Sequence, residues 1–347
     1  MTDRPIAYVM EQTLGNVTHY LNLKTRDAHE AGARRWLPIG YPRTNLKLNW
    51  TVLGGLMTRR ALGSVMHEVD GIFIHTITLA TLCFDYFGKK PTVLSTDGTP
   101  QNKREMRGSY GLKPEHPLSR QAKQFAYRKV FRNAAGFVAW SNWAKESFVH
   151  DYGCAEEDVV VIPPGVDLEQ FRAGDRAHEL PRLLFVGGDF ARKGGDLLLD
   201  VFRGRLRGRA ELDVVTRDPV PEESGVRVHR DVSANSEKLK QLYASSDVFV
   251  LPTRADCYSL VCMEAMASSL PCVVTRAGGI EDLVADGDTG YLVGIDSADA
   301  LGDALDALVN DGALRERMSR RSREVAEEKL DVQKTSRRLF EYVRSRC

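Results

Sequence analysis

Two carboxylates flank a segment that the chain buries. Asp256 and Glu264 stand eight positions apart in "RADCYSLVCMEAMASSLPCVVTRAGG", and the residues between them are almost all apolar. The run "DVFVLP" before them predicts a strand, and "SLVCMEAMA" predicts a helix that Ser259 could cap. A helix start lined with backbone N–H groups suits a diphosphate. A carboxylate just inside the helix can take ribose hydroxyls, and one in the loop can reach a sugar. The plainer alternative for either acid is a solvated charge or a cap.

A second candidate phosphate site is a glycine loop. "LLFVGGDFARKGGDLLLDVF" predicts a strand, a loop and a helix. Gly187 and Gly188 let the backbone come close to a ligand, while Lys193 and the following helix start offer positive charge. The loop is neither a Walker A sequence nor Gly-x-Gly-x-x-Gly, so the usual ATP and NAD fingerprints are missing. A tight turn with a surface lysine is the alternative interpretation.

These loops must be positioned by regular elements, and the chain alternates strand-like with helix-like stretches. The strand-like runs are "IAYVM", "GIFIH", "PTVLS", "GFVAW" and "VVVIP", then, after Pro163-Pro164-Gly165, "RLLFVGG", "LDVVT", "DVFVLP", "PCVVT" and "GYLV". Alternation of this kind predicts α/β structure with parallel sheets, here two Rossmann-like domains (1–163 and 164–331) facing each other across a cleft. Ligands of such sheets bind at the carboxyl ends of strands, where both loops lie.

Composition narrows the class of protein. The 347 residues with 43% hydrophobic content suffice for two globular domains, and a net charge of +1 does not favour nucleic acid as a partner. The N-terminus does not resemble a secretion signal, and the longest apolar run, 72–84, is shorter than the roughly 20 residues of a membrane span. The six scattered cysteines form no Cys-x-x-Cys pair, which favours a reducing cytosol over a zinc or disulfide framework.

One stretch is strongly basic. Residues 101–132 hold nine Lys or Arg against two Glu, a local net charge of 9 − 2 = +7. Apolar residues recur near helical spacing from Leu118 onward, so one face of a helix is expected to pack and the other to be basic. These apolar residues are Leu118, Ala122, Phe125, Ala126 and Val130. The basic face is either a solvated surface, a contact with an anionic membrane, or a contact with an anionic acceptor.

Several stretches, in order, resemble glycosyltransferase family 4, the retaining enzymes of the two-Rossmann GT-B architecture. They are "SNWAKESFVHDYG", "VIPPGVDLEQF", "FVGGDFARKGGDLLL", the acid-x7-Glu segment and "GGIEDLVADGDTGYLV". The resemblance is strong from 136 to 293 and weak elsewhere. It implies that Glu264 holds the nucleotide ribose, that Asp256 contacts the donor sugar and that Lys193 contacts the diphosphate. It also implies a wider set of donor-binding residues: Gly187, Gly188, Arg192, Cys257, Tyr258, Ser259 and Leu260.

The resemblance extends weakly into the first half. "DGIFIHTIT" resembles the family's strand that ends in a histidine, which implies that His75 faces the reacting sugar. Without the family, a buried core histidine would be the simpler interpretation. Gly15 resembles one glycine of the loop after the first strand, where donor phosphate and acceptor approach.

Three positions depart from the family pattern. The first acid is Asp256, one methylene shorter than the family's Glu, and Gly188 stands where an arginine is common. Arg192 is the candidate for supplying that missing charge. The second glycine of the N-terminal loop is replaced by Asn16.

A formal Asp-x-Asp metal signature is also present, at Asp286-Gly287-Asp288. It lies between a predicted helix and a predicted strand, where Asp and Gly are ordinary turn residues. We therefore expect a turn there, and no metal or other cofactor.

The expected function is a retaining, metal-independent transfer of a sugar from a UDP-, GDP- or other nucleotide-sugar to an acceptor hydroxyl. The donor is expected in the C-terminal domain. The acceptor, a glycan, a lipid-linked molecule or a small molecule, is expected in the N-terminal one. Lys193, the helix dipole and backbone amides would stabilise the leaving diphosphate, Asp256 would orient the sugar, and His75 would hold it near the reacting centre.

The family's usual work suggests bacterial envelope polysaccharide, lipopolysaccharide or glycolipid synthesis, in the cytoplasm or at the inner face of the membrane. The last helix, about 332–347, is expected to pack back on the N-terminal domain. Two alternatives remain open: an epimerase or phosphorylase on the same fold, and a catalytically silent subunit that only binds a nucleotide-sugar.

Overall fold

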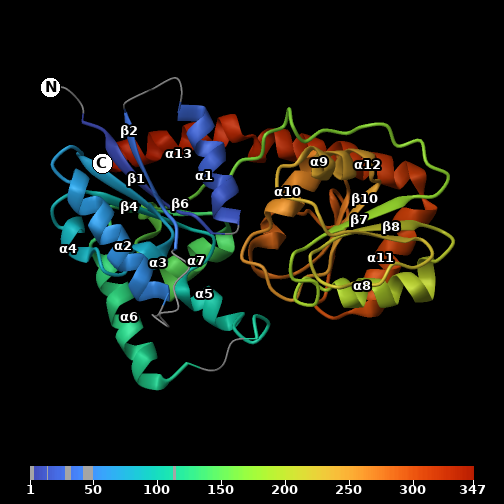
Figure 1. Ribbon diagram of the computed structural model, residues 1–347, viewed down its shortest axis with the longest axis horizontal. Helices are drawn as coiled ribbons and strands as arrows, with labels where there is room; N and C mark the ends of the chain where they lie inside the picture. The colour runs from blue at the N-terminus through green and yellow to red at the C-terminus, as the bar shows by residue number, and fades with distance from the viewer. Residues whose placement is uncertain (1–3, 14, 28–32, 42–49, 112–114) are drawn as a thin grey trace. The chain divides into compact units, whose positions relative to one another are not determined.

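The computed structural model describes residues 4–13, 15–27, 33–41, 50–111 and 115–347 (Figure 1). It divides into two compact units. Unit 1 comprises Met1–Arg107, Leu112–Gly165 and Gln333–Cys347, and unit 2 comprises Gly108–Gly111 and Val166–Val332. Each unit contains one six-stranded parallel sheet with helices. The expected α/β class with two Rossmann-like domains is therefore confirmed.

Unit 1 has the strand order β2-β1-β3-β4-β5-β6, with all pairs parallel. The strands are β1 (Ile6–Glu11), β2 (Arg34–Ile39), β3 (Gly71–His75), β4 (Thr92–Thr96), β5 (Gly136–Ala139) and β6 (Val159–Val161). The helices are α1 (Gly15–Arg26), α2 (Trp50–Val65), α3 (Ile77–Ala80), α4 (Phe84–Phe87), α5 (Pro100–Glu105), α6 (Pro117–Arg132), α7 (Asn142–His150) and α13 (Val332–Arg346), with a 3-10 turn at Glu156–Asp158. The order reverses between β1 and β3, and ligands of open α/β sheets bind outside the carboxyl ends of strands at such a point.

Alternate residues of the unit 1 strands build two cores, one on each face of the sheet. On one face, Val9 and Ile74 pack with buried residues of α2, α6 and α7. On the other face, Tyr8, Met10 and Phe73 pack with α1 and with Leu339 and Val343 of α13.

Helix α13 is tied to the sheet of unit 1 by polar contacts as well. The Tyr342 hydroxyl accepts from the Phe137 N–H (3.3 Å) and donates to the Asp158 carbonyl (2.7 Å). The Arg346 guanidinium pairs with the Asp158 carboxylate at 2.7 Å. In Figure 1 this helix, red because it ends the sequence, lies beside the blue strands that begin it.

Unit 2 has the strand order β12-β11-β10-β7-β8-β9, again all parallel. The strands are β7 (Arg182–Val186), β8 (Glu211–Val215), β9 (Val226–His229), β10 (Val248–Leu251), β11 (Cys272–Thr275) and β12 (Gly290–Val293). The helices are α8 (Gly195–Val201), α9 (Glu237–Ser245), α10 (Leu260–Ala267), α11 (Ala298–Asn310) and α12 (Gly312–Val325), with shorter turns at Phe202–Leu206, Gly278–Asp282 and Ala326–Leu330. Here the order reverses between β7 and β10, whose following loops carry the lysine and the aspartate singled out above.

Two strands escaped the sequence analysis, β2 and β9. Each is an edge strand of its sheet. The sequence of β2 is RRWLPI and that of β9 is VRVH, so neither is a continuous apolar run. Charged residues and proline are typical of edges, where they discourage further strand pairing, and they hide the apolar signal on which strand prediction depends.

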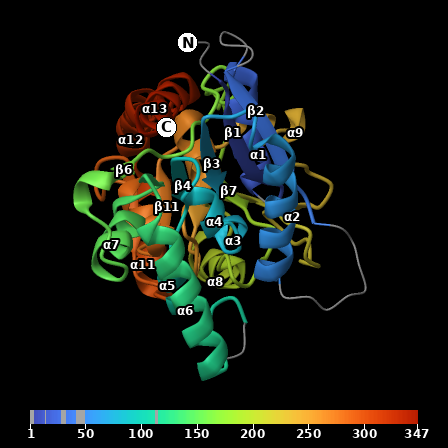
Figure 2. The same ribbon diagram turned by 90° about the vertical axis from the view of Figure 1, so that its left-hand side faces the viewer.

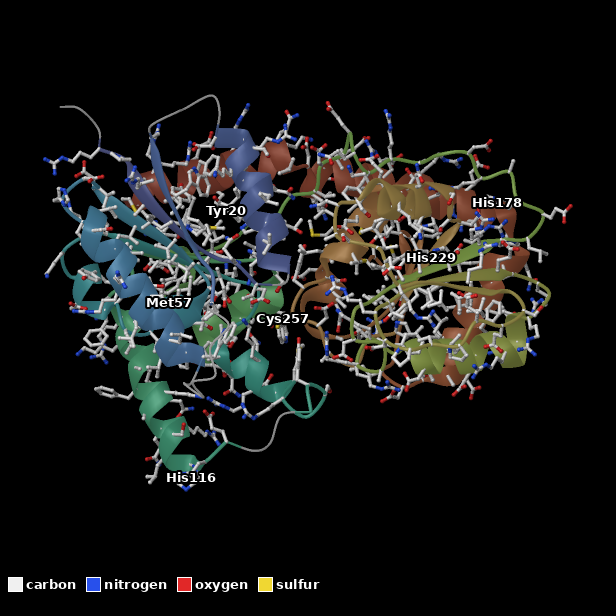
Figure 3. All side chains as sticks on the ribbon, viewed as in Figure 1. Tyr20, Met57, His116, His178, His229 and Cys257 are labelled. Atoms are coloured by element: carbon white, nitrogen blue, oxygen red, sulfur yellow. The ribbon has the colours of Figure 1, made fainter. Side chains whose placement is uncertain are left out.

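The expectation that the apolar face of the basic helix α6 packs is wrong for Leu118 and Phe125. Leu118 and Phe125 are 69% and 72% exposed, whereas Tyr127, Val130 and Phe131 are buried. Figure 2 shows the reason, because α6 extends away from the sheet at its N-terminal end. His116, labelled in Figure 3, caps that outer end. Lys113 of the basic stretch lies outside the described residues. No helix within the described ranges is long and apolar enough to cross a membrane.

We expect Tyr342→Phe to lower the free energy of unfolding of unit 1 by about 1–2 kcal/mol, because it leaves the Phe137 N–H and the Asp158 carbonyl without the hydroxyl. All four tryptophans of the chain lie in unit 1, so their fluorescence during urea unfolding reports on this unit. Ser345→Ala removes an exposed hydroxyl from the same helix and serves as control. Equal midpoints for Tyr342→Phe and the control would contradict the role of this anchor.

Candidate functional site

The glycine loop after β7 has one glycine that the backbone requires. Gly194 has φ +74, and a Cβ there would lie 2.0 Å from the Pro252 carbonyl oxygen in the loop after β10. Gly187 is also confined, since a Cβ would lie 3.0 Å from the Lys193 side chain. A Cβ on Gly188 would meet nothing within 4 Å. Packing therefore explains Gly187 and Gly194, whereas at position 188 it leaves room for the first carbon of a side chain.

Lys193 and Asp256 come together in this structure. The Lys193 ammonium donates to Asp256 Oδ2, and the two side chains are only 13% and 14% exposed. The lysine follows β7 and the aspartate follows β10, which are neighbours in the sheet. Two residues that the sequence separates by more than sixty positions thus form one ion pair at the carboxyl edge of unit 2.

Arg192 joins the same two loops. Its guanidinium donates to the Ala255 carbonyl (2.7 Å) and to Asp189 (3.0 Å), and its own carbonyl accepts from the Arg254 N–H (2.8 Å). Arg254 in turn pairs with Asp196 at 2.7 Å. In this structure the guanidinium of Arg192 therefore holds the loop after β10, which is a different use from the replacement charge suggested by the sequence.

The start of α10 follows the sequence expectation locally. The Ser259 hydroxyl accepts from the Cys262 N–H (3.4 Å), and Leu260 is the first helical residue. Cys257, labelled in Figure 3, and Tyr258 are buried, and the Cys257 carbonyl accepts from the Gly279 N–H at 2.9 Å.

Glu264 is a buried carboxyl with one clear partner that the sequence did not reveal. It is 7% exposed, and its Oε2 accepts from the Tyr243 hydroxyl at 2.9 Å. Burial raises the pKa of Glu264 to about 7, and the Tyr243 hydrogen bond partly opposes that rise. At neutral pH the group is thus divided between its charged and neutral forms, so hydroxyl donors that reach it would favour ionisation.

In unit 1, His75 ends β3 and is fully buried. Its Nε2 lies 3.1 Å from Asn16 Oδ1, and its Nδ1 lies 3.1 Å from Ser95 Oγ. The Trp140 ring stacks on the imidazole with a centroid distance of 4.9 Å and an interplanar angle of 12°. Burial, with Lys103 adding to it, lowers the pKa of His75 to about 3. The imidazole is therefore neutral at physiological pH.

Glu11 is a functional candidate that the sequence analysis missed. It is the last residue of β1, adjacent to β3, and it is 5% exposed. Its carboxylate accepts from the hydroxyls of Thr76 (2.6 Å) and Tyr41 (2.9 Å). The available signal was its place: a charged residue directly after an apolar strand and before the Gly15 loop.

His19, on α1, is a second residue that the sequence did not single out. Its ring lies 5.0 Å from those of His75 and Trp140, and neither of its nitrogens has a hydrogen-bond partner among the described residues. Burial and His75 lower its pKa well below the ordinary value. A cavity of about 10 Å³ adjoins His19 and Ser95, which is roughly the space of one water molecule.

The Asp-x-Asp segment forms a turn whose acids face arginines. Asp286 pairs with Arg276 at 2.9 Å, Asp288 pairs with Arg321 at 3.2 Å, and Gly287 has φ +79. Within the part of the chain that the structure describes, no three His, Cys, Asp or Glu side chains gather as a metal site would require.

The raised pKa of Glu264 predicts a loss of stability with rising pH. The folded state keeps the proton up to about pH 7, whereas the unfolded chain loses it near 4.5. Below pH 4.5 both states keep the proton and Glu264 costs no stability. Between pH 4.5 and about 7 the free energy of unfolding falls, by on the order of 3 kcal/mol.

Glu264→Gln removes this dependence, so its free energy of unfolding should rise relative to that of the natural chain as pH increases from 4.5 to 7. Chemical unfolding followed by far-ultraviolet circular dichroism at several pH values measures the difference. Parallel profiles for the two chains would show that the carboxyl is not held neutral.

Two family models match the chain. One, described as Glycosyltransferase Family 4, covers residues 19–170, and one, described as Glycosyl transferases group 1, covers residues 180–311. The D-inositol 3-phosphate glycosyltransferase of Nocardia farcinica is 32% identical over 240 residues, which are 61% of this chain and 52% of that protein. The one from Geodermatophilus obscurus is 30% identical over 212 residues, 52% of this chain and 46% of that protein. The chain thus spans about half the length of these curated relatives.

Solved structures agree over nearly the whole chain. Sucrose-phosphate synthase from Thermosynechococcus elongatus superposes with a TM-score of 0.78 at 14% identity, covering 99% of this chain and 98% of that one. Anabaena HepE in complex with UDP and glucose gives 0.74 at 16% identity, covering 99% and 100%. Identities this low show a shared fold alone, the GT-B architecture, but the two family models match most of the sequence. The chain belongs to glycosyltransferase family 4.

Proposed function

We propose that this protein transfers a sugar from a nucleotide-diphosphate sugar to an acceptor hydroxyl, with retention of the anomeric configuration. The observation that carries the proposal is the Lys193–Asp256 pair at the carboxyl ends of β7 and β10, with the buried Glu264 in the helix that follows. A cation, a loop carboxylate and a helix carboxylate are the groups that a diphosphate, a sugar and a ribose need. The Anabaena relative of the same fold is described in complexes with UDP and with UDP-glucose, which supports this donor class.

Donor binding would exchange the partners of the ion pair. A diphosphate near the start of α10 attracts the Lys193 ammonium, because it carries more negative charge than one carboxylate. Asp256 is then released to accept from a sugar hydroxyl. As the sugar leaves the diphosphate, negative charge grows on the phosphate oxygens, where Lys193 and the backbone N–H groups of α10 stabilise it.

Retention follows from which group takes the acceptor proton. A side chain with a pKa of about 3 is a poor base, so His75 is unsuited to deprotonating an alcohol. The leaving phosphate is the better acceptor, and it lies on the face of the sugar that it has just left. Attack from that same face retains the configuration. His75 then has the task of hydrogen bonding to the sugar.

We expect the acceptor to be an anion that carries hydroxyl groups. The names of the curated relatives and the basic stretch of unit 1 both favour such a molecule. The curated relatives are named for D-inositol 3-phosphate. Lys103, in the basic stretch of unit 1, is close enough to His75 to help lower its pKa.

We further propose that α6 docks on an anionic membrane, where lipid-linked envelope acceptors would be found. Leu118 and Phe125 are exposed on the half of α6 that leaves the sheet, and Arg120 and Arg128 are exposed on the same helix. Apolar side chains that enter the lipid boundary beside cations that meet anionic headgroups are the pattern of an interfacial helix.

Lys193→Met should weaken nucleotide binding about tenfold or more, because a charge-assisted hydrogen bond to the diphosphate is lost. A thermal-shift screen of UDP, GDP, ADP and their sugars first identifies the nucleotide, and calorimetry then measures its dissociation constant. Lys240→Met is a matched control, since Lys240 is also an ion-paired lysine of unit 2 but pairs with Glu237 on α9. Equal affinities for the two variants would remove Lys193 from the donor site.

Phe125→Ser combined with Leu118→Ser should release the protein from vesicles that contain phosphatidylglycerol at low salt. Sedimentation with those vesicles and with neutral phosphatidylcholine vesicles measures the binding. Ile295→Ser removes a comparably apolar exposed residue from unit 2 and should leave the bound fraction unchanged. If the natural chain sediments equally with neutral and anionic vesicles, α6 is a solvated helix and not a docking surface.

A further inference from the structure

Both ring nitrogens of His75 are used by hydrogen bonds inside unit 1, at 3.1 Å each. A neutral imidazole has one nitrogen that donates and one that accepts. Which nitrogen donates depends on what the neighbours can offer. Ser95 offers a hydroxyl that can donate or accept and a backbone carbonyl that can only accept, so the Asn16 side decides the arrangement.

The arrangement starts at Glu11. Its carboxylate is buried, and it takes the hydroxyl hydrogens of Thr76 at 2.6 Å and Tyr41 at 2.9 Å. Burial, and after it the nearby Glu11, raises the pKa of Tyr41, so the phenol keeps its proton and donates. An ionised carboxylate can only accept hydrogen bonds. Any further polar group that faces Glu11 must therefore present a hydrogen.

Asn16 is that further group. Its Nδ2 lies 3.5 Å from Glu11 Oε2 and 3.4 Å from the Thr13 hydroxyl, while its Oδ1 lies 3.1 Å from His75 Nε2. The reverse orientation would place a carbonyl oxygen against a carboxylate, which is repulsive. The amide oxygen therefore faces the histidine, and because that oxygen only accepts, Nε2 must carry the hydrogen. Nδ1 is left to accept from the Ser95 hydroxyl.

We propose that Glu11 is a positioning residue for His75: by orienting the Asn16 amide it fixes the Nε2–H tautomer, so that His75 presents a hydrogen-bond donor to a sugar oxygen. The inference rests on the proposed function for the sugar, but the tautomer itself does not depend on it. A sugar oxygen that accepts from Nε2 would have to replace Asn16 Oδ1, which lies 3.1 Å from that nitrogen. The substrate must therefore displace the amide, which a glycine at position 16 would not require.

The surroundings keep the ring in this state. Trp140 stacks on the imidazole and limits its rotation, and the low pKa of His75 keeps it neutral. An Nε2–H group of fixed direction can donate to a sugar oxygen, but it cannot take up a proton. This agrees with the low pKa of His75, which makes the imidazole a poor base.

Glu11→Gln, made in the Tyr41→Phe background, tests the proposal because glutamine has the same shape but carries an amide nitrogen that must donate, and without the Tyr41 hydroxyl that nitrogen finds its acceptors on the side of Thr76 and Asn16. The Asn16 amide would then turn its oxygen toward residue 11 and its nitrogen toward His75, and the hydrogen would move from Nε2 to Nδ1. Nitrogen NMR of the chain labelled with ¹⁵N-histidine distinguishes the two tautomers, with the His75 signals identified by their loss in His75→Gln.

We expect the Nε2–H form in the natural chain and the Nδ1–H form when Glu11→Gln is made in the Tyr41→Phe background. Tyr41→Phe alone is the matched control: it removes a neighbour of Glu11 but leaves the carboxylate at position 11, so the Nε2–H form should persist. The turnover number of Glu11→Gln should fall about tenfold, the effect of one misdirected hydrogen bond, while the Michaelis constant for the donor changes little.

An Nδ1–H form in the natural chain would overturn the proposal even if Glu11→Gln fails to fold. An unchanged tautomer in a folded Glu11→Gln variant would overturn it as well. If the tautomer switches as expected but the natural chain transfers no sugar, the proposed function is wrong and the positioning by Glu11 stands.

Discussion

Parallel strands deliver all their carboxyl ends to one edge of a sheet, and the rest of this structure depends on that constraint. In each unit the strand order reverses beside the first strand of the sheet along the chain, β1 in unit 1 and β7 in unit 2. At such a reversal the chain segments that follow two adjacent strands turn away from each other. The residues at these strand ends therefore need not pack against the neighbouring segment and can be polar. Glu11 and His75 occupy these positions in unit 1, and Lys193 and Asp256 occupy them in unit 2.

Three buried or half-buried carboxyls show how one chemical group is used in three ways. Asp256 is balanced by an ammonium, Glu11 is satisfied by hydroxyl donors, and Glu264 has a single hydroxyl and a pKa of about 7. For Glu264 the cost of burying a charge is decisive, because burial favours its neutral form and one hydroxyl opposes this only in part. The acid that the environment leaves least satisfied is the one placed to receive a ribose in the proposed function.

The departures from the family pattern have different physical meanings. Gly188 is not required by packing at its Cβ, and the missing arginine removes both a charge and its hydrogen-bond donors. Asp256, although shorter than glutamate, still reaches the Lys193 ammonium. Asn16 is the most consequential departure, since its amide links Glu11 to His75 and fills space that a glycine would leave open.

The sequence by itself determined the α/β class, the two parallel sheets, the loops that carry Lys193 and Asp256, and the helix that carries Glu264. These follow from short-range signals: the period of the apolar residues, glycine in tight turns and a serine at a helix start. Only the tertiary structure decided that β2 and β9 close the sheet edges, that Leu118 and Phe125 stay exposed, and that Tyr243 contacts Glu264. Likewise, Glu11 meets Thr76 across 65 positions because β1 lies beside β3, a pairing that no local pattern specifies. Contacts of that kind depend on strand order, and strand order is a property of the folded sheet.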